Sequence, residues 1–227
     1  MNRLSSDTPT IAVIGASTGQ LPLVRKAKEM GVYTICFAWE NGAVCKEECD
    51  EFYPISIFEI DDIVTKCKEL KVDGVISTAS EETSLVSSVI AQRLNLTGAL
   101  PDAIKRIQNK KWVREMTRSI PGLSNPKVWT ISQKHDISYP CVVKPVKGSS
   151  KKGVSFCRSE HYLREALEYA SENVSEIVIE EYIGGQEYSV ETLSYKGRHH
   201  VIQITRKVTT GYPHFVELEH HQPALLD

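Results

Sequence analysis

Alternation of strand-like and helix-like segments between residues 10 and 98 is the feature that most restricts the fold. Apolar runs with the composition of buried strands lie at 10–15, 32–38, 52–55 and 74–78. Segments with apolar residues at the helical period lie at 21–30, 60–70 and 82–94. This rhythm predicts an α/β domain with a doubly wound parallel sheet and right-handed crossovers.

Ligands of such sheets bind at the carboxyl ends of the strands. The residues expected there are Gly15–Gly19 after the first strand, Glu40 after the second, and Ser80–Glu82 after the fourth. Glu81 is a candidate substrate contact, although an acid at a helix start also has a capping role. A dinucleotide fingerprint stays open because Glu40 has the spacing of a ribose-binding acid, but Ser17 stands where that pattern needs glycine.

A second organised stretch is 139–153, YPCVVKPVKGSSKKG. Its first part predicts a buried strand, yet Lys144 lies in the middle, on the same face as Val142. An ammonium among apolar neighbours needs an anion or dense hydrogen bonding. The glycine-bounded basic loop that follows, 148–153, has backbone freedom suited to phosphate. The stretch therefore predicts a phosphate grip, with a hairpin bearing an edge lysine as the alternative.

The run from Glu180 to Glu187 joins two predicted strands through Gly184 and Gly185. Strand alternation places Glu187, Ser189 and Glu191 on one face. Acids beside a flexible joint suit a nucleotide, with backbone groups at the base and a carboxylate at the ribose. An ordinary strand–turn–strand with solvated acids is the alternative.

Domain organisation follows from these segments. We expect an α/β domain at 1–98 and an α+β domain at 99–227. The second comprises a helical connector (99–124), a small mobile lid lobe (125–183) and the start of a further lobe (184–227). Two short helices broken near Asn109 make up the connector, and a turn-rich boundary with Pro121 and Pro126 ends it.

Composition excludes several classes of protein. The net charge is −2 with both signs interspersed, so no polyanion-binding surface is expected. The apolar runs are too short for a membrane span, and residues 1–10 lack the apolar region of a secretory signal, so a cytoplasmic protein is expected. Cys45 and Cys49 resemble half a metal site, but the six scattered cysteines favour free thiols.

Taken in order, these motifs resemble the ATP-grasp superfamily. They are an α/β domain, a helix with Asn109–Lys110, the Tyr-Pro-x-x-x-Lys-Pro strand at 139–145, the glycine loop, and Glu-Glu-Tyr-Ile-x-Gly-x-Glu at 180–187. The amino-terminal part is similar to the domain that precedes the ATP-grasp domain in carbamoyl phosphate synthase large subunit and biotin carboxylase.

The resemblance implies ATP and Mg²⁺ as cofactors and assigns roles to individual residues. Lys110 and Lys144 would contact the phosphates, and the loop with Gly148, Ser149, Ser150 and Gly153 would close over them. Glu180, Glu181 and Ile183 would read adenine, largely through backbone groups, and Glu187 would hold the ribose. In the last strands Arg206, Lys207 and His220 would be catalytic, and Glu219 would face the substrate.

The implied function is an ATP-dependent ligase that activates a carboxylate as an acyl phosphate for attack by an amine. A carbamoyl-phosphate-synthase-like enzyme acting on bicarbonate and a catalytically silent nucleotide-binding protein are the alternatives. Complete members carry magnesium ligands further along, so the chain is interpreted as an incomplete catalytic unit with those ligands beyond Asp227. The expected partners are ATP and a small carboxylate, with no nucleic acid or membrane; a homodimer stays open.

Overall fold

A computed structural model describes residues 8–133, 135–148, 152–171, 176–212 and 215–226. It divides into two compact units, residues 1–109 and 110–227. The predicted domain boundary at residue 98 stays a prediction; the last helix before residue 109 belongs to the first compact unit.

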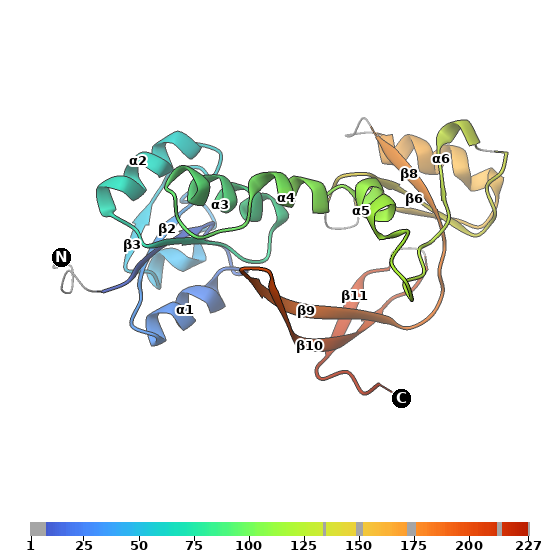
Figure 1. Ribbon diagram of the computed structural model, residues 1–227. Coiled ribbons are helices and arrows are strands. Elements are labelled where there is room, and N and C mark those ends of the chain that lie inside the picture. The colour runs from blue at the N-terminus through green and yellow to red at the C-terminus, as the bar shows by residue number, and fades with distance from the viewer. Residues whose placement is uncertain (1–7, 134, 149–151, 172–175, 213–214, 227) are drawn as a thin grey trace. The chain divides into compact units, whose positions relative to one another are not determined.

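The first unit is built on a parallel sheet of strand order β3-β2-β1-β4 (Figure 1). The strands are β1 (Thr10–Ile14), β2 (Tyr33–Phe37), β3 (Glu51–Tyr53) and β4 (Gly74–Ile76). The helices are α1 (Leu21–Glu29), α2 (Ile60–Leu70), α3 (Glu81–Arg93) and α4 (Pro101–Ile107), with the 3₁₀ turn η1 (Val44–Glu47). The parallel α/β prediction is confirmed.

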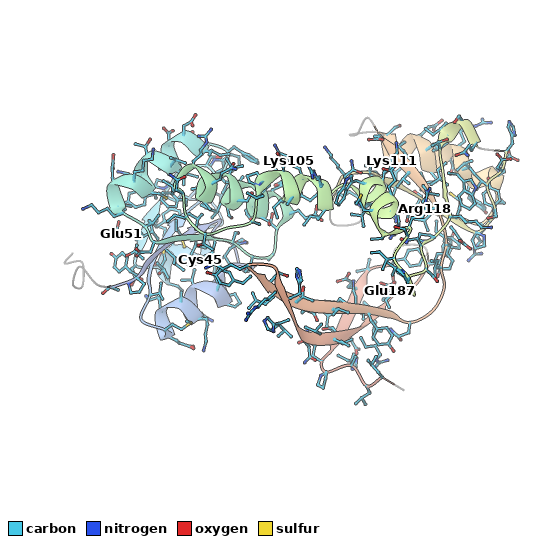
Figure 2. All side chains as sticks on the ribbon, in the orientation of Figure 1. Cys45, Glu51, Lys105, Lys111, Arg118 and Glu187 are labelled. Atoms are coloured by element: carbon cyan, nitrogen blue, oxygen red, sulfur yellow. The ribbon has the colours of Figure 1, made fainter. Side chains whose placement is uncertain are left out.

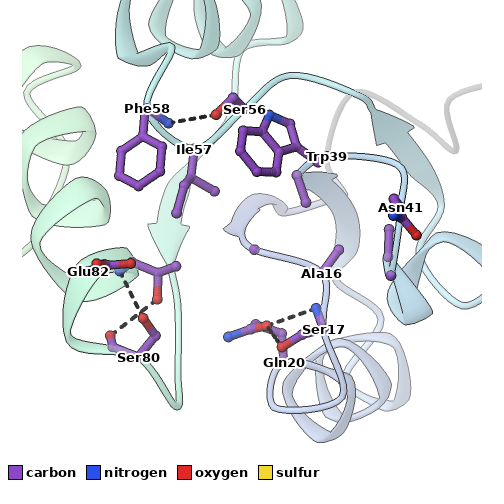
Figure 3. A pocket seen from close by; sticks show the side chains of 15 residues that line it. Ala16, Ser17, Gln20, Trp39, Asn41, Ser56, Ile57, Phe58, Ser80 and Glu82 are labelled. Carbon is purple, nitrogen blue, oxygen red and sulfur yellow. Dashed lines mark hydrogen bonds between the residues drawn. The ribbon is translucent and has the colours of Figure 1, made fainter. Parts of the chain in front are cut away.

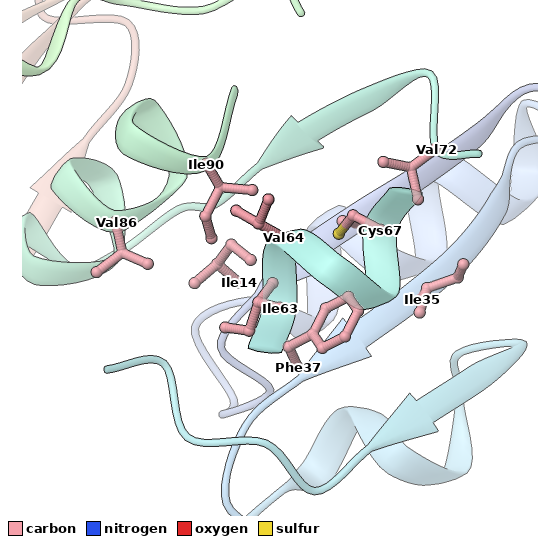
Figure 4. Close-up of a cluster of buried hydrophobic side chains, with 10 residues drawn as sticks. Ile14, Ile35, Phe37, Ile63, Val64, Cys67, Val72, Val86 and Ile90 are labelled. Atoms are coloured by element: carbon pink, nitrogen blue, oxygen red, sulfur yellow. The ribbon is translucent and has the colours of Figure 1, made fainter. Parts of the chain in front are cut away.

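Both faces of this sheet are covered, as the alternation of side chains on β1 shows. Ala12 and Ile14 pack with α2 and α3, and Figure 4 shows Ile63, Val64 and Ile90 closing that core. Val13 points to the other face and packs with Val24 of α1 and Cys45 of η1. The sheet is therefore doubly wound, and its central strands β1 and β2 read as nearly continuous apolar runs because both of their faces are covered.

The second unit begins with α5 (Lys110–Thr117), which has no buried residue. Its first sheet is antiparallel, in the order β5-β8-β6-β7. These strands are β5 (Val128–Trp129), β6 (Cys141–Pro145), β7 (Ser155–Cys157) and β8 (Ile177–Glu181); η2 (Ile131–Gln133) and α6 (Glu160–Ser171) complete the lobe.

One face of this sheet packs against α6. Leu163, Ala166 and Ala170 form the helix stripe predicted by the helical period, and they meet Val143 and Ile179 of the strands. On the opposite face Phe156 packs edge-on against Tyr182, with ring centroids 4.7 Å apart. The predicted small α+β lobe is confirmed.

A three-stranded antiparallel sheet of order β11-β10-β9 ends the chain. The strands are β9 (Glu187–Tyr195), β10 (Arg198–Thr209) and β11 (Glu217–His221). Ser189 and Glu191 lie on one face, as predicted, because the Ser189 hydroxyl donates to the Glu191 carboxylate at 2.7 Å. No helix among the described residues is long and apolar enough to cross a membrane.

Candidate functional site

Lys144 meets an anion supplied by the chain itself. Its ammonium pairs with the Glu180 carboxylate, whose side chain is only 3% exposed. Arg114 grips the same carboxylate in a bidentate arrangement, with Nε to Oε1 at 2.9 Å and Nη2 to Oε2 at 3.2 Å. One buried carboxylate is thus shared by two cations, which are 18% (Lys144) and 31% (Arg114) exposed.

Strand register explains why these side chains meet. Val142 of β6 lies opposite Glu180 of β8, so Glu180 is a diagonal neighbour of Lys144 on the same face of the sheet. Arg114 comes from α5, one helical turn beyond Lys110. The face that does not pack on α6 therefore carries charged groups held between a sheet and a polar helix.

The Glu180 carboxylate stays ionised in this setting. Burial by itself raises the pKa of this carboxyl, but hydrogen bonds and charges from Arg114 and Lys144 outweigh that effect. The pKa therefore lies below its ordinary value of 4.5. The cluster carries two positive charges and one negative, which leaves it net cationic.

Lys110 lies beside the predicted phosphate loop. Its ammonium donates to the Gly148 carbonyl at 3.0 Å, and its backbone N–H donates to the Val146 carbonyl at 3.1 Å. Gly153 closes the other end of the loop with φ +70° and packs against the Pro145 ring. Ser149 and Ser150 lie outside the described residues.

The predicted adenine and ribose residues lie after β8 and at the start of β9. The Glu181 carboxylate accepts from the Lys127 backbone N–H at 3.0 Å, so that side chain holds β5 and β8 together. Ile183 is 61% exposed, and Glu187 is exposed at the first position of β9 (Figure 2). The predicted nucleotide contacts of these residues stay predictions.

The candidate acceptor residues separate into two groups. Arg206 and His220 line one polar pocket, together with Gln186, Tyr188, His221, Gln222, Pro223 and Leu225. The Lys207 ammonium pairs with Glu217 at 2.5 Å, and the Glu219 carboxylate pairs with His221 at 2.7 Å; neither Lys207 nor Glu219 is among the lining residues. Their catalytic and substrate roles stay predictions.

A pocket of about 290 Å³ lies in the first unit, at the carboxyl ends of the parallel strands (Figure 3). Loops after all four strands line it, as expected for this class of sheet. The lining residues are Gly15, Ala16, Ser17, Gln20, Ala38, Trp39, Asn41, Gly42, Ala43, Ser56, Ile57, Phe58, Ser80, Glu82 and Thr83.

The sequence identified the position of this pocket but not most of its side chains. Glu82 lines it, whereas Glu81 is not among the lining residues; the Glu81 backbone carbonyl accepts from Gln108 at 2.9 Å. Glu40 pairs with Lys46 at 2.6 Å on the surface. Nothing in the sequence placed Trp39 and Phe58 at a pocket, because their positions there depend on how loops from different strands pack together.

Arg114 is a further residue of the candidate site for which the sequence predicted no role. Its spacing of four residues from Lys110 on a helix was a usable signal, but the partner carboxylate could not be named without the register of β6 and β8. All six cysteines are free thiols, as their scatter favoured. The described residues include no cluster of three or more His, Cys, Asp or Glu arranged to hold a metal ion, so Cys45 and Cys49 are not part of one there.

Comparison with known proteins gives consistent matches. Residues 137–226 match the ATP-grasp domain. A D-alanine–D-alanine ligase from Flavobacterium johnsoniae is 41% identical over 73 residues, which cover 32% of this chain and 23% of that enzyme. The crystal structure of an L-amino acid ligase from Bacillus licheniformis matches with a TM-score of 0.80 and 26% identity, covering 98% of this chain and 56% of that one.

A third match shows the fold alone, because the identity is 18%. It is the biotin carboxylase domain of 2-oxoglutarate carboxylase from Hydrogenobacter thermophilus, solved with MgADP, ADP and bicarbonate, with a TM-score of 0.71. The match covers 86% of this chain and 49% of that one. The chain thus spans about a quarter of the D-alanine–D-alanine ligase and about half of each solved structure. The domain match shows an ATP-grasp domain at residues 137–226, and the folds of both units and the order of the motifs are similar to those of ATP-grasp proteins.

Proposed function

We propose that this chain is part of an ATP-dependent ligase that activates a carboxylate as an acyl phosphate for attack by an amine. The observation that carries the proposal is the Glu180 carboxylate held between Lys144 and Arg114. A fully neutralised pair would have no charge left for a ligand. Two cations share one carboxylate, so one positive charge remains at this site. Phosphate oxygens accept strong hydrogen bonds from charged donors of this kind.

The carboxylate orients both cations before a ligand arrives. Glu180 is buried and hydrogen-bonded through both oxygens, so it restricts the rotamers of Lys144 and Arg114. Charged groups fixed in advance stabilise developing charge without reorganisation during the reaction. In phosphoryl transfer the protein acts chiefly through such positioning and charge, so no covalent nucleophile on the chain is required.

The remaining nucleotide contacts follow the family resemblance. Lys110, at the Gly148 carbonyl, would reach the phosphates next to the loop. The exposed Ile183 would offer apolar surface to the adenine ring, and Glu187 would accept hydrogen bonds from the ribose hydroxyls. Magnesium is included in the proposal for the charge it neutralises on the phosphates. No residue is assigned to it, because the described residues hold no suitable cluster.

The amine-ligase assignment takes its support from the relatives. Two of the three matches above are named for joining amino acids, the D-alanine–D-alanine ligase and the L-amino acid ligase. Arg206 and His220, which share a pocket, would face the carboxylate or the acyl phosphate. Lys207 would act there only if its ion pair with Glu217 opened, and Glu219 only if its hydrogen bond with His221 opened.

Nucleotide preference tests this proposal. ATP and NAD are titrated into the chain with magnesium present, and heat is measured by calorimetry. We expect ATP to bind more tightly than NAD, and Lys144→Met to weaken ATP binding. Lys111→Met is the matched control on α5, because Lys111 pairs with Glu176 at 3.4 Å in an exposed position. Tighter binding of NAD, or equal loss of ATP affinity in both variants, would contradict the assignment.

A further inference from the structure

Two cysteines lie directly opposite each other in the first sheet of the second unit. Cys141 begins β6 and Cys157 ends β7, and the antiparallel register pairs them. Residues paired in this way have Cα atoms about 4.5–5.5 Å apart, and disulfides span Cα distances of about 4.4–6.8 Å. The strand register therefore places these two cysteines at the spacing that a disulfide needs.

The two side chains also share one environment. Both are fully buried, in the cluster that α6 covers with Leu163 and Ala166. A hydrogen bond between the two thiols, together with burial, raises the pKa of Cys141, whereas the same hydrogen bond lowers the pKa of Cys157. Cys157 is therefore the more readily deprotonated of the two, and the thiolate is the form that reacts with oxidants.

The position of Cys157 in the sheet also favours its reaction first. β7 is an edge strand that pairs with β6 alone, and Cys157 is its last residue, followed by the exposed Arg158. Local opening of a short edge strand exposes Cys157 more easily than Cys141, since β6 is paired on both sides. The free side of β7 also lets the Cβ atoms close from about 4.5–5.5 Å to the roughly 3.5–4.5 Å of a disulfide.

The other cysteines lack this arrangement in the part of the chain that the structure describes. Cys36, Cys45 and Cys49 pack in one region of the first unit, but only Cys36 belongs to a strand, so no register pairs them. Cys67 is buried in a cluster that contains no second cysteine. Cys67 is therefore a matched control for a buried thiol without a partner.

We propose that Cys141 and Cys157 form a reversible disulfide when the chain meets a peroxide, so that this hairpin is a redox modification site. The Cys157 thiolate attacks one oxygen of hydrogen peroxide and the O–O bond breaks. The leaving hydroxide takes the proton that the thiol lost, which gives a sulfenic acid and water. The Cys141 sulfur then attacks the Cys157 sulfur, the S–O bond breaks, and hydroxide leaves with the Cys141 proton as a second water. The two cysteines lose two electrons and the peroxide gains them.

The disulfide would hold β7 in the sheet. Only Ser155, Phe156 and Cys157 pair with β6, so a covalent link at one of these positions restricts the separation of the two strands. The same hairpin carries the glycine loop at 148–153. The proposal does not depend on the ligase function, because it concerns the thiols and the strand pairing alone.

Peptide mapping of the whole chain tests the proposal. The folded chain is treated with hydrogen peroxide, alkylated in denaturant and digested with trypsin, which releases Cys141 in residues 135–147 and Cys157 in residues 153–158. We expect these two peptides to be linked, to separate on reduction with dithiothreitol, and to exceed any link of Cys141 to a first-unit cysteine about tenfold or more. Oxidation of Met30, which is 70% exposed, marks a sufficient dose of peroxide. Recovery of both peptides unlinked at that dose would overturn the proposal.

Hydrogen exchange tests the effect on β7. In the oxidised chain the amides of residues 155–157 should exchange about tenfold more slowly than in the reduced chain, because the strand no longer separates. Cys157→Ser should abolish both the link and the slowing, whereas Cys67→Ser should keep both. Equal slowing in Cys157→Ser, or none in the wild-type chain, would overturn the role of the disulfide in holding β7. Mapping of the wild-type chain needs no variant, so it decides the modification site even if Cys157→Ser does not fold.

Discussion

The sheets of the two units differ in what covers their faces. The parallel sheet of the first unit is packed on both faces by apolar helix surfaces. The sheet of β5–β8 is packed on one face by α6, while its other face meets α5 through the Arg114–Glu180 ion pair. Chemistry in the first unit is therefore confined to the strand ends, whereas the second unit can place charged groups in the middle of strands.

The difference follows from the energetics of burial. A charge within the first sheet would lie between two apolar layers, where an ion is strongly disfavoured. In the second unit, α5 has no buried residue and brings cations to the sheet, so Lys144 and Glu180 have partners. Four predictions test this comparison, from the largest expected effect to the smallest.

Replacing Glu180 should break the charged face. Glu180→Gln leaves Lys144 and Arg114 next to each other without their carboxylate, and we expect a loss of about 3–5 kcal/mol in the free energy of unfolding. Glu176→Gln is the control, because Glu176 pairs with Lys111 on the surface and should cost less than about 1 kcal/mol. Urea unfolding of both variants measures these losses. Similar losses in the two variants would show that the burial of Glu180 does not determine the free energy lost.

A substitution at Gly153 tests how tightly the sheet packs on the face covered by α6. Its φ is +70°, and an added Cβ would lie 2.8 Å from Pro145 Cγ and 3.4 Å from Ala170 Cα. Gly153→Ala is therefore expected to cost about 2–4 kcal/mol, from both backbone strain and overpacking.

Gly197 supplies a matched control for that substitution. It has φ +75° with no atom within 4 Å of an added Cβ, so Gly197→Ala should cost only the backbone term of about 1–2 kcal/mol. Melting temperature and urea midpoint measure the difference. A smaller loss at Gly153 than at Gly197 would mean that the packing on Pro145 is not tight.

Lys144 is expected to contribute both to folding stability and to nucleotide binding. Lys144→Met leaves Glu180 paired with Arg114 alone, so a loss of about 1–2 kcal/mol in stability is expected. The free energy of ATP binding should fall by about 1.5–3 kcal/mol, the range for a hydrogen bond to a charged group. If stability falls and ATP affinity does not change, Lys144 serves only the ion pair. Lys111→Met should change neither quantity by more than about 0.5 kcal/mol.

Acid should weaken the charged face selectively. The pKa of Glu180 is lowered in the folded state, so the unfolded carboxyl takes up a proton first as the pH falls. The stabilisation is therefore present above the ordinary pKa of 4.5 and is lost as the pH falls below it towards the folded pKa. Urea unfolding between pH 6 and pH 3 should show this loss in the wild-type chain, and a shallower dependence in Glu180→Gln. Equal slopes would place the pH dependence at other carboxyls.

Much of the molecule was predictable from local patterns. The predicted strands at 10–15 and 32–38 and the helix at 60–70 correspond to observed elements within a residue or two. Strand alternation also placed Lys144 on the same face as Val142, and in the structure this is the face away from α6. Such predictions succeed because side-chain period and turn chemistry are properties of neighbouring residues.

Partners from distant segments were not predictable in the same way. The sequence predicted an anion beside Lys144 and favoured a phosphate. In the structure the anion is Glu180, 36 positions later in the chain, because β6 and β8 pair in a particular register. Likewise, Trp39, Phe58 and Glu82 share a pocket only because loops after three different strands gather at one edge of a parallel sheet.

By itself, then, the sequence determined where the strands and helices form, which faces they bury and the order of motifs typical of the superfamily. Only the tertiary structure decided which anion meets Lys144, that Arg114 shares it, and that Trp39, Phe58 and Glu82 line one pocket. The reason is physical: local periodicity fixes the direction of a side chain from its neighbours, whereas strand register and loop convergence depend on the packing of segments far apart in the chain.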